Sequence, residues 1–113
     1  MDSVTVCAVG GELDHLTADA FRQSLLEALP TAGAVVVIDL SRVTFFGVAG
    51  LRVLMEARSW FGRSGRRLQL ITGPRCVDRL LEVAGHTAVF DIIPSLAAVA
   101  RTKPLASVRA SAR

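Results

Sequence analysis

The chain has 113 residues, of which 51% are hydrophobic, and a formal net charge of +3. This length fits a single domain with a sizeable core, and no apolar run approaches the roughly 20 residues that a membrane-spanning helix needs. The N-terminus lacks the basic and then apolar pattern of a secretory signal, so we expect a cytoplasmic protein without a membrane partner.

Positive charge is concentrated at the C-terminal end of the sequence. Residues 101–113 contain four basic residues and no acid, whereas residues 1–100 contain nine arginines and ten acids. We predict a folded domain over residues 1–100 and a basic, disordered tail over residues 101–113. The alternative for the tail is a nonspecific electrostatic role. Because the folded part is nearly neutral, direct binding to nucleic acid is not expected.

The first part of the chain alternates between strand and helix patterns. Residues 4–9 read as a strand, which Gly10–Gly11 interrupts or ends. Thr17 is a suitable N-cap for a helix whose apolar face extends to residue 29. The apolar run over residues 34–40 predicts a strand buried on both faces, as in a parallel sheet covered by helices.

The second part of the chain continues the same alternation. A helix is predicted from residues 48–50 to about residue 61, a strand over 68–72, a helix over 77–84, a strand over 89–93 and a last helix over 96–101. This order favours a single α/β domain with a largely parallel sheet.

The connection between the central strand and the following helix is the most informative segment. A helix N-terminus presents free N–H groups and a partial positive charge, which suits an anion or a phosphorylated residue. The predicted tip here is Gly47-Val48-Ala49, which has neither a hydroxyl nor a carboxylate. The sequence therefore predicts a strand–loop–helix connection suited to a phosphorylation switch, but the tip of this connection lacks a residue that could be phosphorylated.

No group of residues indicates an enzyme. The sequence has no serine, histidine and aspartate set in a plausible context, and Gly47–Gly50 lacks the lysine and hydroxyl of a nucleotide phosphate loop. Cys7 and Cys76 do not have metal-ligand spacing and are expected to be structural or inert. We therefore predict no catalytic residue, no metal and no cofactor.

Three stretches together carry a family resemblance. They are Gly11–Asp14 followed by Leu16–Ala18, then Val37–Phe45, and then Gly50–Leu54. In combination they resemble the STAS domain, the fold of bacterial anti-sigma factor antagonists and of the cytoplasmic tails of sulfate transporters. The resemblance covers about residues 4–100. It implies an α/β STAS fold with a mostly parallel mixed sheet of four to five strands and about four helices.

The sequence departs from this family at its N-terminal edge. The family usually has a further strand before the one predicted at residues 4–9, and this chain has no room for it. The edge of the sheet is then uncovered, unless another segment covers it. An uncovered edge would allow pairing with a second subunit, which makes a homodimer one hypothesis for the assembly.

The sequence also departs from the family at the switch loop. The family typically carries Asp-Ser-Ser/Thr-Gly, and a partner kinase phosphorylates the first serine. By resemblance, Gly47 takes the aspartate position, Val48 the phosphoacceptor position and Ala49 the position of the next hydroxyl, while Gly50 is retained. The resemblance therefore implies a loop that cannot be phosphorylated at Val48.

Three polar residues near this loop need separate interpretation. Asp14 matches another acidic residue of the family's site, but a cap at the entry to a helix would use the same carboxylate, and we weigh both roles equally. Ser41 and Thr44 are expected to serve turn and strand roles rather than to act as substitute phosphoacceptors.

The resemblance favours a protein-binding module of the anti-sigma factor antagonist type. The predicted contact surface comprises Asp14, Phe46, Gly47, Val48, Ala49, Gly50, Arg52, Val53 and Glu56. The expected partner is an anti-sigma factor with a serine-kinase fold, whose capture would free a sigma factor constitutively or under control of abundance. The alternatives are a scaffold STAS protein and the STAS subunit of a lipid-transport ABC complex. Small-ligand binding at the loop is less favoured because polar groups there are sparse.

Overall fold

The computed structural model describes residues 3–73, 75–85, 89–95 and 105–111. Its elements in chain order are β1 (Val4–Leu13), α1 (Ala18–Ala28), the 3-10 turn η1 (Leu29–Thr31), β2 (Val35–Phe46), α2 (Val48–Arg63), β3 (Arg67–Ile71), α3 (Arg75–Val83), β4 (Asp91–Ile92) and β5 (Leu105–Ser111). The predicted alternation of strands and helices is confirmed through β4. The helix predicted over residues 96–101 lies outside the described residues.

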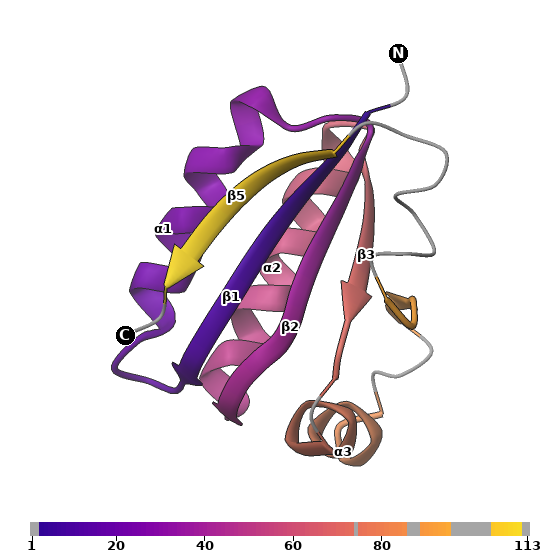
Figure 1. Cartoon of the computed structure of the whole chain (residues 1–113). Helices are drawn as coiled ribbons and strands as arrows, with labels where there is room; N and C mark the ends of the chain where they lie inside the picture. Colours follow the sequence, from indigo (N-terminus) through magenta and orange to yellow (C-terminus); the bar gives the residue numbers. More distant parts are fainter. Residues whose placement is uncertain (1–2, 74, 86–88, 96–104, 112–113) are drawn as a thin grey trace.

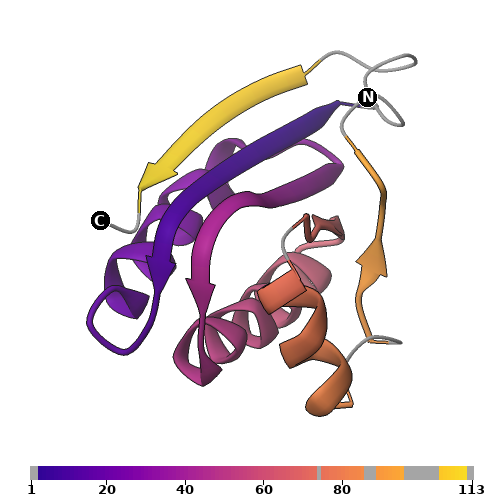
Figure 2. The same cartoon turned by 60° about the horizontal axis from the view of Figure 1, so that its bottom comes forward.

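The five strands form one sheet in the order β4-β3-β2-β1-β5. Every pairing between described strands is parallel, so the sheet is parallel rather than mixed. Helices α1 and α2 lie side by side on one face of the sheet, and α3 lies near the ends of β2 and β3 (Figures 1 and 2). The predicted α/β architecture is therefore confirmed.

The core forms on both faces of the two central strands. The face toward α1 and α2 is packed with Cys7, Val9, Ile38 and Leu40 from the strands and Phe21, Leu25, Leu54 and Phe61 from the helices. A smaller cluster on the opposite face comprises Val4, Val6, Val35, Val37 and Ile71. The prediction of a strand buried on both faces is confirmed for Val35–Ile38, all of which are buried.

Strand β1 does not end at its glycine pair. It continues to Leu13, and its register against β2 shifts between Ala8 and Gly10 and again between Gly11 and Glu12. Gly11 has a φ of 83°, a conformation that glycine adopts without the steric cost of a side chain. The pair therefore acts as an irregular step inside the strand rather than as its end.

Strand β2 is also longer than its apolar run. It extends through Phe46 because its second half pairs with the continuation of β1, with Leu13 opposite Phe46. Within this second half Val43 and Phe46 are buried, whereas Ser41, Arg42, Thr44 and Phe45 are exposed. The strand therefore extends six residues beyond the predicted apolar run of residues 34–40, and Gly47 alone links β2 to α2.

Strand β5 corrects the interpretation of the C-terminal segment. Residues 101–113 were predicted to be a disordered tail, but Leu105–Ser111 form a strand parallel to β1, with Val4 opposite Leu105 and Gly10 opposite Ser111. Figure 1 shows β5 along the outer side of β1. Of the two alternatives for the edge of β1, the structure shows the second, since another segment of the same chain covers it.

Candidate functional site

The carboxyl ends of β1, β2 and β3 lie at the same end of the sheet because the strands are parallel, and a helix begins after each of them (Figure 1). Binding sites of open parallel sheets lie outside the carboxyl ends of the strands, where the connecting loops meet. The connection predicted to bind a partner is at this end.

Close packing fixes the start of α2 against the end of β1. The N–H of Gly47 donates to the carbonyl of Leu13 at 2.9 Å. A Cβ atom on Gly50 would lie 3.0 Å from Leu13 Cβ and 3.0 Å from Phe46 Cε1, so this position has little room for a side chain. Together Gly47 and Gly50 let the helix begin directly above the core.

The N-terminus of α2 exposes an apolar residue. Its first turn contains no acidic residue, and no side-chain hydrogen bond caps it within the described part of the chain. Val48, the first residue of the helix, is 63% exposed, and Ala49 is half-buried. The partial positive charge of the helix end therefore lies beside a small apolar contact.

Two further apolar residues are exposed at the same end of the molecule. Leu16, in the β1–α1 connection, is 72% exposed, and Phe45, near the end of β2, is 50% exposed. The Phe45 ring lies against Gly47, since a Cβ there would be 3.1 Å from Phe45 Cε2. We call Leu16, Phe45 and Val48 the apolar rim. Sequence reasoning missed Leu16 and Phe45, although one of the adjacent Phe45 and Phe46 had to face outward from a strand.

Some of the predicted contact residues lie in the core. Phe46, Gly50 and Val53 are buried, so they shape the loop from beneath instead of presenting side chains to a partner. Arg52 is exposed on the first turns of α2, next to the apolar rim along the helix. The structure therefore brings the predicted residues together, but only the exposed ones can contact a partner with their side chains.

Asp14 caps the turn that leads into α1. Its Oδ1 accepts hydrogen bonds from the N–H of Leu16 at 2.9 Å and of Thr17 at 3.1 Å. Desolvation raises the pKa of the Asp14 carboxyl, but these hydrogen bonds and the charge of His15 outweigh it and lower the pKa below its ordinary value. The geometry supports the structural alternative for Asp14, since one carboxylate oxygen is already bonded to the backbone.

Glu56 joins α2 to α1. Its two carboxylate oxygens accept from Arg22, with Nε to Oε1 at 2.8 Å and Nη2 to Oε2 at 3.2 Å. The hydrogen bonds from Arg22 lower the pKa of Glu56, and the opposing effect of desolvation is smaller. Arg22 also pairs with Asp19 in the first turn of α1. Glu56 therefore has a structural partner at the edge of the predicted contact surface.

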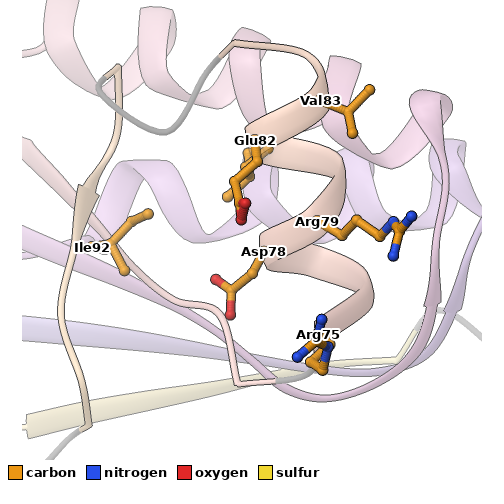
Figure 3. Close-up of a pocket in the computed structure, with 7 residues that line it drawn as sticks. Arg75, Asp78, Arg79, Glu82, Val83 and Ile92 are labelled. Carbon is orange, nitrogen blue, oxygen red and sulfur yellow. The ribbon is translucent and has the colours of Figure 1, made fainter.

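The structure also contains hollows away from the apolar rim. One, of about 560 Å³, lies between α3 and β4, where Asp78 and Glu82 are on the side of the helix that faces Ile92 and Arg79 extends to the other side (Figure 3). Within the described residues, no three or more His, Cys, Asp or Glu side chains form a group that could hold a metal ion. None of the described helices is long and apolar enough to span a bilayer.

Comparison with known proteins decides the family. Residues 1–94 match the family model described as "Mlab, STAS domain". The chain belongs to the STAS domain family. A relative from Mycobacterium tuberculosis, the anti-sigma-F factor antagonist RsfB, is 36% identical over 63 residues, which are 56% of this chain and 52% of that protein. The matched part of this STAS domain thus spans about half the length of the curated relatives.

Solved structures show the same fold. An anti-sigma factor antagonist from Mycobacterium paratuberculosis has a TM-score of 0.74 at 28% identity, with 89% of this chain and 86% of that chain covered. The STAS domain of a SulP transporter from Vibrio cholerae has a TM-score of 0.66 at 19% identity, with 88% and 83% covered. The antagonist SpoIIAA in its unphosphorylated form has a TM-score of 0.64 at 17% identity, with 86% and 87% covered. The last two support the fold alone.

Proposed function

We propose that this STAS domain is an anti-sigma factor antagonist whose contact surface is not switched by phosphorylation. The observation that carries the proposal is the exposed Val48 at the first position of α2, on the end of the sheet that also exposes Leu16 and Phe45. The names of the mycobacterial relatives support the antagonist function. The proposed partner is a cytoplasmic anti-sigma factor with a serine-kinase fold.

The apolar rim explains how such a surface would bind without a covalent signal. A phosphate at the start of α2 would add nearly two negative charges, whose desolvation against an apolar partner surface would oppose binding, and valine cannot accept a phosphate. Burying an exposed aliphatic or aromatic side chain contributes about 1.5–3 kcal/mol. Leu16, Phe45 and Val48 would supply this apolar contact, and the exposed Arg52 would supply a polar contact at its margin. Binding would then depend on the abundance of the two proteins.

Calorimetric titration with the anti-sigma factor encoded nearest to this gene tests the contact surface. Val48→Asp should weaken binding at least about tenfold, because a charge would be buried without a partner. Val83→Asp is the matched control, since Val83 is 79% exposed on α3 and does not belong to the rim. Equal affinity of the Val48→Asp variant and the original chain would rule out docking through this rim.

A labelling experiment tests the absence of phosphorylation. The chain is incubated with the same partner and γ-labelled ATP, in parallel with Val48→Ser. The original chain should remain unlabelled, whereas the variant regains a hydroxyl at an exposed helix start and should accept label. Stoichiometric labelling of the original chain would overturn the proposal of an unswitched surface.

A second candidate is the STAS subunit of a lipid-transport ABC complex. The same helix start favours it, because a subunit that stays assembled with an ATPase needs no phosphorylatable residue at Val48. Co-purification of the tagged chain with the products of neighbouring genes separates the two candidates. Recovery of an ABC ATPase and loss of that recovery in Val48→Asp would favour this second function.

A further inference from the structure

We propose that a hollow at the C-terminal end of α2 binds a phosphate-bearing organic anion. The α2 residues that line this hollow, Arg58 to Arg63, lie ten to fifteen residues after Val48, which at 1.5 Å per residue is about 15–22 Å along the helix from its start. The site is therefore separate from the apolar rim, and its proposal does not depend on the anti-sigma factor.

Four arginines surround this hollow, which has a volume of about 510 Å³. Arg58 and Arg63 come from α2, Arg66 from the turn after it and Arg67 from the start of β3. The one acid among the described lining residues is Asp91, which already pairs with Arg67 at 3.2 Å. Positive charge therefore clearly exceeds negative charge around the hollow.

The helix end does not account for this excess. A helix C-terminus carries the equivalent of about half a negative charge, which a single basic residue in the last turn offsets. Arg63 already occupies the last turn of α2. Arg67 is paired with Asp91, so Arg58 and Arg66 bring positive charge that no ion pair with the described residues neutralises.

Two of the arginines are held in place by bonds that leave their outer nitrogens available. Arg58 donates from Nε to the carbonyl of Val89 at 3.2 Å, and Arg66 donates from Nε to the carbonyl of Ala32 at 3.2 Å. The side chain of Arg63 has no hydrogen bond or ion pair with any residue that the structure describes. Holding a side chain before binding lowers the entropic cost of binding.

The chemistry of the lining indicates the class of ligand. A planar guanidinium group can donate two parallel hydrogen bonds to phosphate oxygens, and several such groups favour an anion with more than one charge. The volume falls within the range of about 300–1,000 Å³ that is typical of small-molecule sites. Leu68, Val89 and Phe90 add apolar surface, which favours an organic group attached to the phosphates over free phosphate.

Titration of the full chain with ATP and with inorganic pyrophosphate, followed by amide NMR at about 0.15 M salt, tests the site. At this ionic strength, surface charges separated by more than about 8 Å are largely screened. ATP should bind saturably and shift amides of residues 58–68 and 89–91, and pyrophosphate should bind the same place more weakly. Sulfate at matched ionic strength producing the same shifts as ATP would overturn the proposal.

Variants identify the arginines that bind. Arg63→Glu should weaken ATP binding at least about tenfold and lower Tm by only a few degrees, because the Arg63 side chain makes no hydrogen bond or ion pair with the described residues and contributes to stability only through the charge at the end of α2. Arg79→Glu, an exposed position on α3 outside this hollow, has the same change of charge and should leave affinity unchanged. Equal losses in both variants would indicate nonspecific attraction and would refute a site.

A glutamate-rich peptide is the competing occupant, since carboxylates also pair with arginine. Tighter binding of that peptide than of ATP would refute the proposed ligand class. No anti-sigma factor is present in these experiments, so their failure and the failure of the proposed function are distinguishable.

Discussion

Val48 and Val53 are five positions apart on α2 (Val48–Arg63) but have opposite environments. Val48 is exposed at the helix start, whereas Val53 is packed between the helix and the sheet. The sequence assigned both residues to one contact surface because both lie in the first turns of the helix. In the structure, those turns expose some positions and bury others. Only the rotation of the helix about its axis, set by the packing of Gly50 against Leu13, separates them.

Cys7 gives a prediction about alkaline stability. Burial raises the pKa of its thiol from 9.0 to about 11. The folded state therefore keeps the thiol proton to a higher pH than the unfolded state. The contribution of this thiol to the free energy of unfolding is fully present below pH 9 and declines as pH rises toward 11. We expect the free energy of unfolding in urea, under reducing conditions, to fall by up to about 3 kcal/mol over this range, at about 1.4 kcal/mol per pH unit.

The composition makes this measurement interpretable, because the chain has no tyrosine and a single lysine, Lys103, that could titrate in the same range. Cys7→Ala should lower stability at pH 8 by the loss of packing but should flatten the decline above pH 9. Cys76→Ala should retain the decline. A slope that persists unchanged in Cys7→Ala would assign the effect to other groups.

At the scale of elements, the sequence predicted the strands and helix faces whose buried positions are all occupied by apolar residues. Val35–Ile38 read directly as a buried strand, and the spacing of Phe21 and Leu25 read as a helix face. The second half of β2 (Val35–Phe46) did not, because only two of its last six residues are buried. Its strand character comes from pairing with β1 (Val4–Leu13) beyond an irregular glycine step, which no local pattern reports.

The Arg22–Glu56 pair between α1 (Ala18–Ala28) and α2 gives a prediction about two packed helices. Both side chains are about one-third exposed, so solvent screens the pair and Glu56→Gln should lower the free energy of unfolding by about 0.5–1 kcal/mol at pH 7. The pKa of Glu56 is lowered in the folded state, so this stabilisation is present above its unfolded value and is lost as pH falls through the folded value.

Urea unfolding at pH 7 and pH 3 measures this effect. The difference between the original chain and Glu56→Gln should be present at pH 7 and absent at pH 3. Glu82→Gln is the control, because Glu82 is exposed on α3 (Arg75–Val83) and forms no ion pair with the described residues. A difference at pH 3 as large as at pH 7 would contradict an ionic contribution.

At the scale of the whole molecule, the sequence could not place residues that meet only through the topology. Five of the seven residues in Leu105–Ser111 are alanine, serine or arginine, a composition that indicates a tail, but the segment completes the sheet beside the first strand, about 100 residues away in the chain. The arginines of the proposed anion site likewise come from α2, the following turn and β3 (Arg67–Ile71). Both features depend on long-range contacts, whereas the α2 start is local and was located correctly.

The pairing of β5 with β1 predicts the effect of removing the C-terminal segment. A chain that ends at residue 104 would leave seven positions of β1, Val4 to Gly10, without their neighbours. Exposed strand edges pair readily with other chains, so this truncated chain should show a larger dimer fraction than the full chain and a lower Tm. Light scattering coupled to size-exclusion chromatography, at equal micromolar concentrations, measures the dimer fraction.

The Arg109→Ser/Arg113→Ser chain removes two positive charges while keeping the strand, and its dimer fraction should match that of the full chain. An unchanged mass and Tm after truncation would show that β5 does not protect the edge of β1, whereas a rise in dimer fraction in the double serine variant would assign the effect to charge.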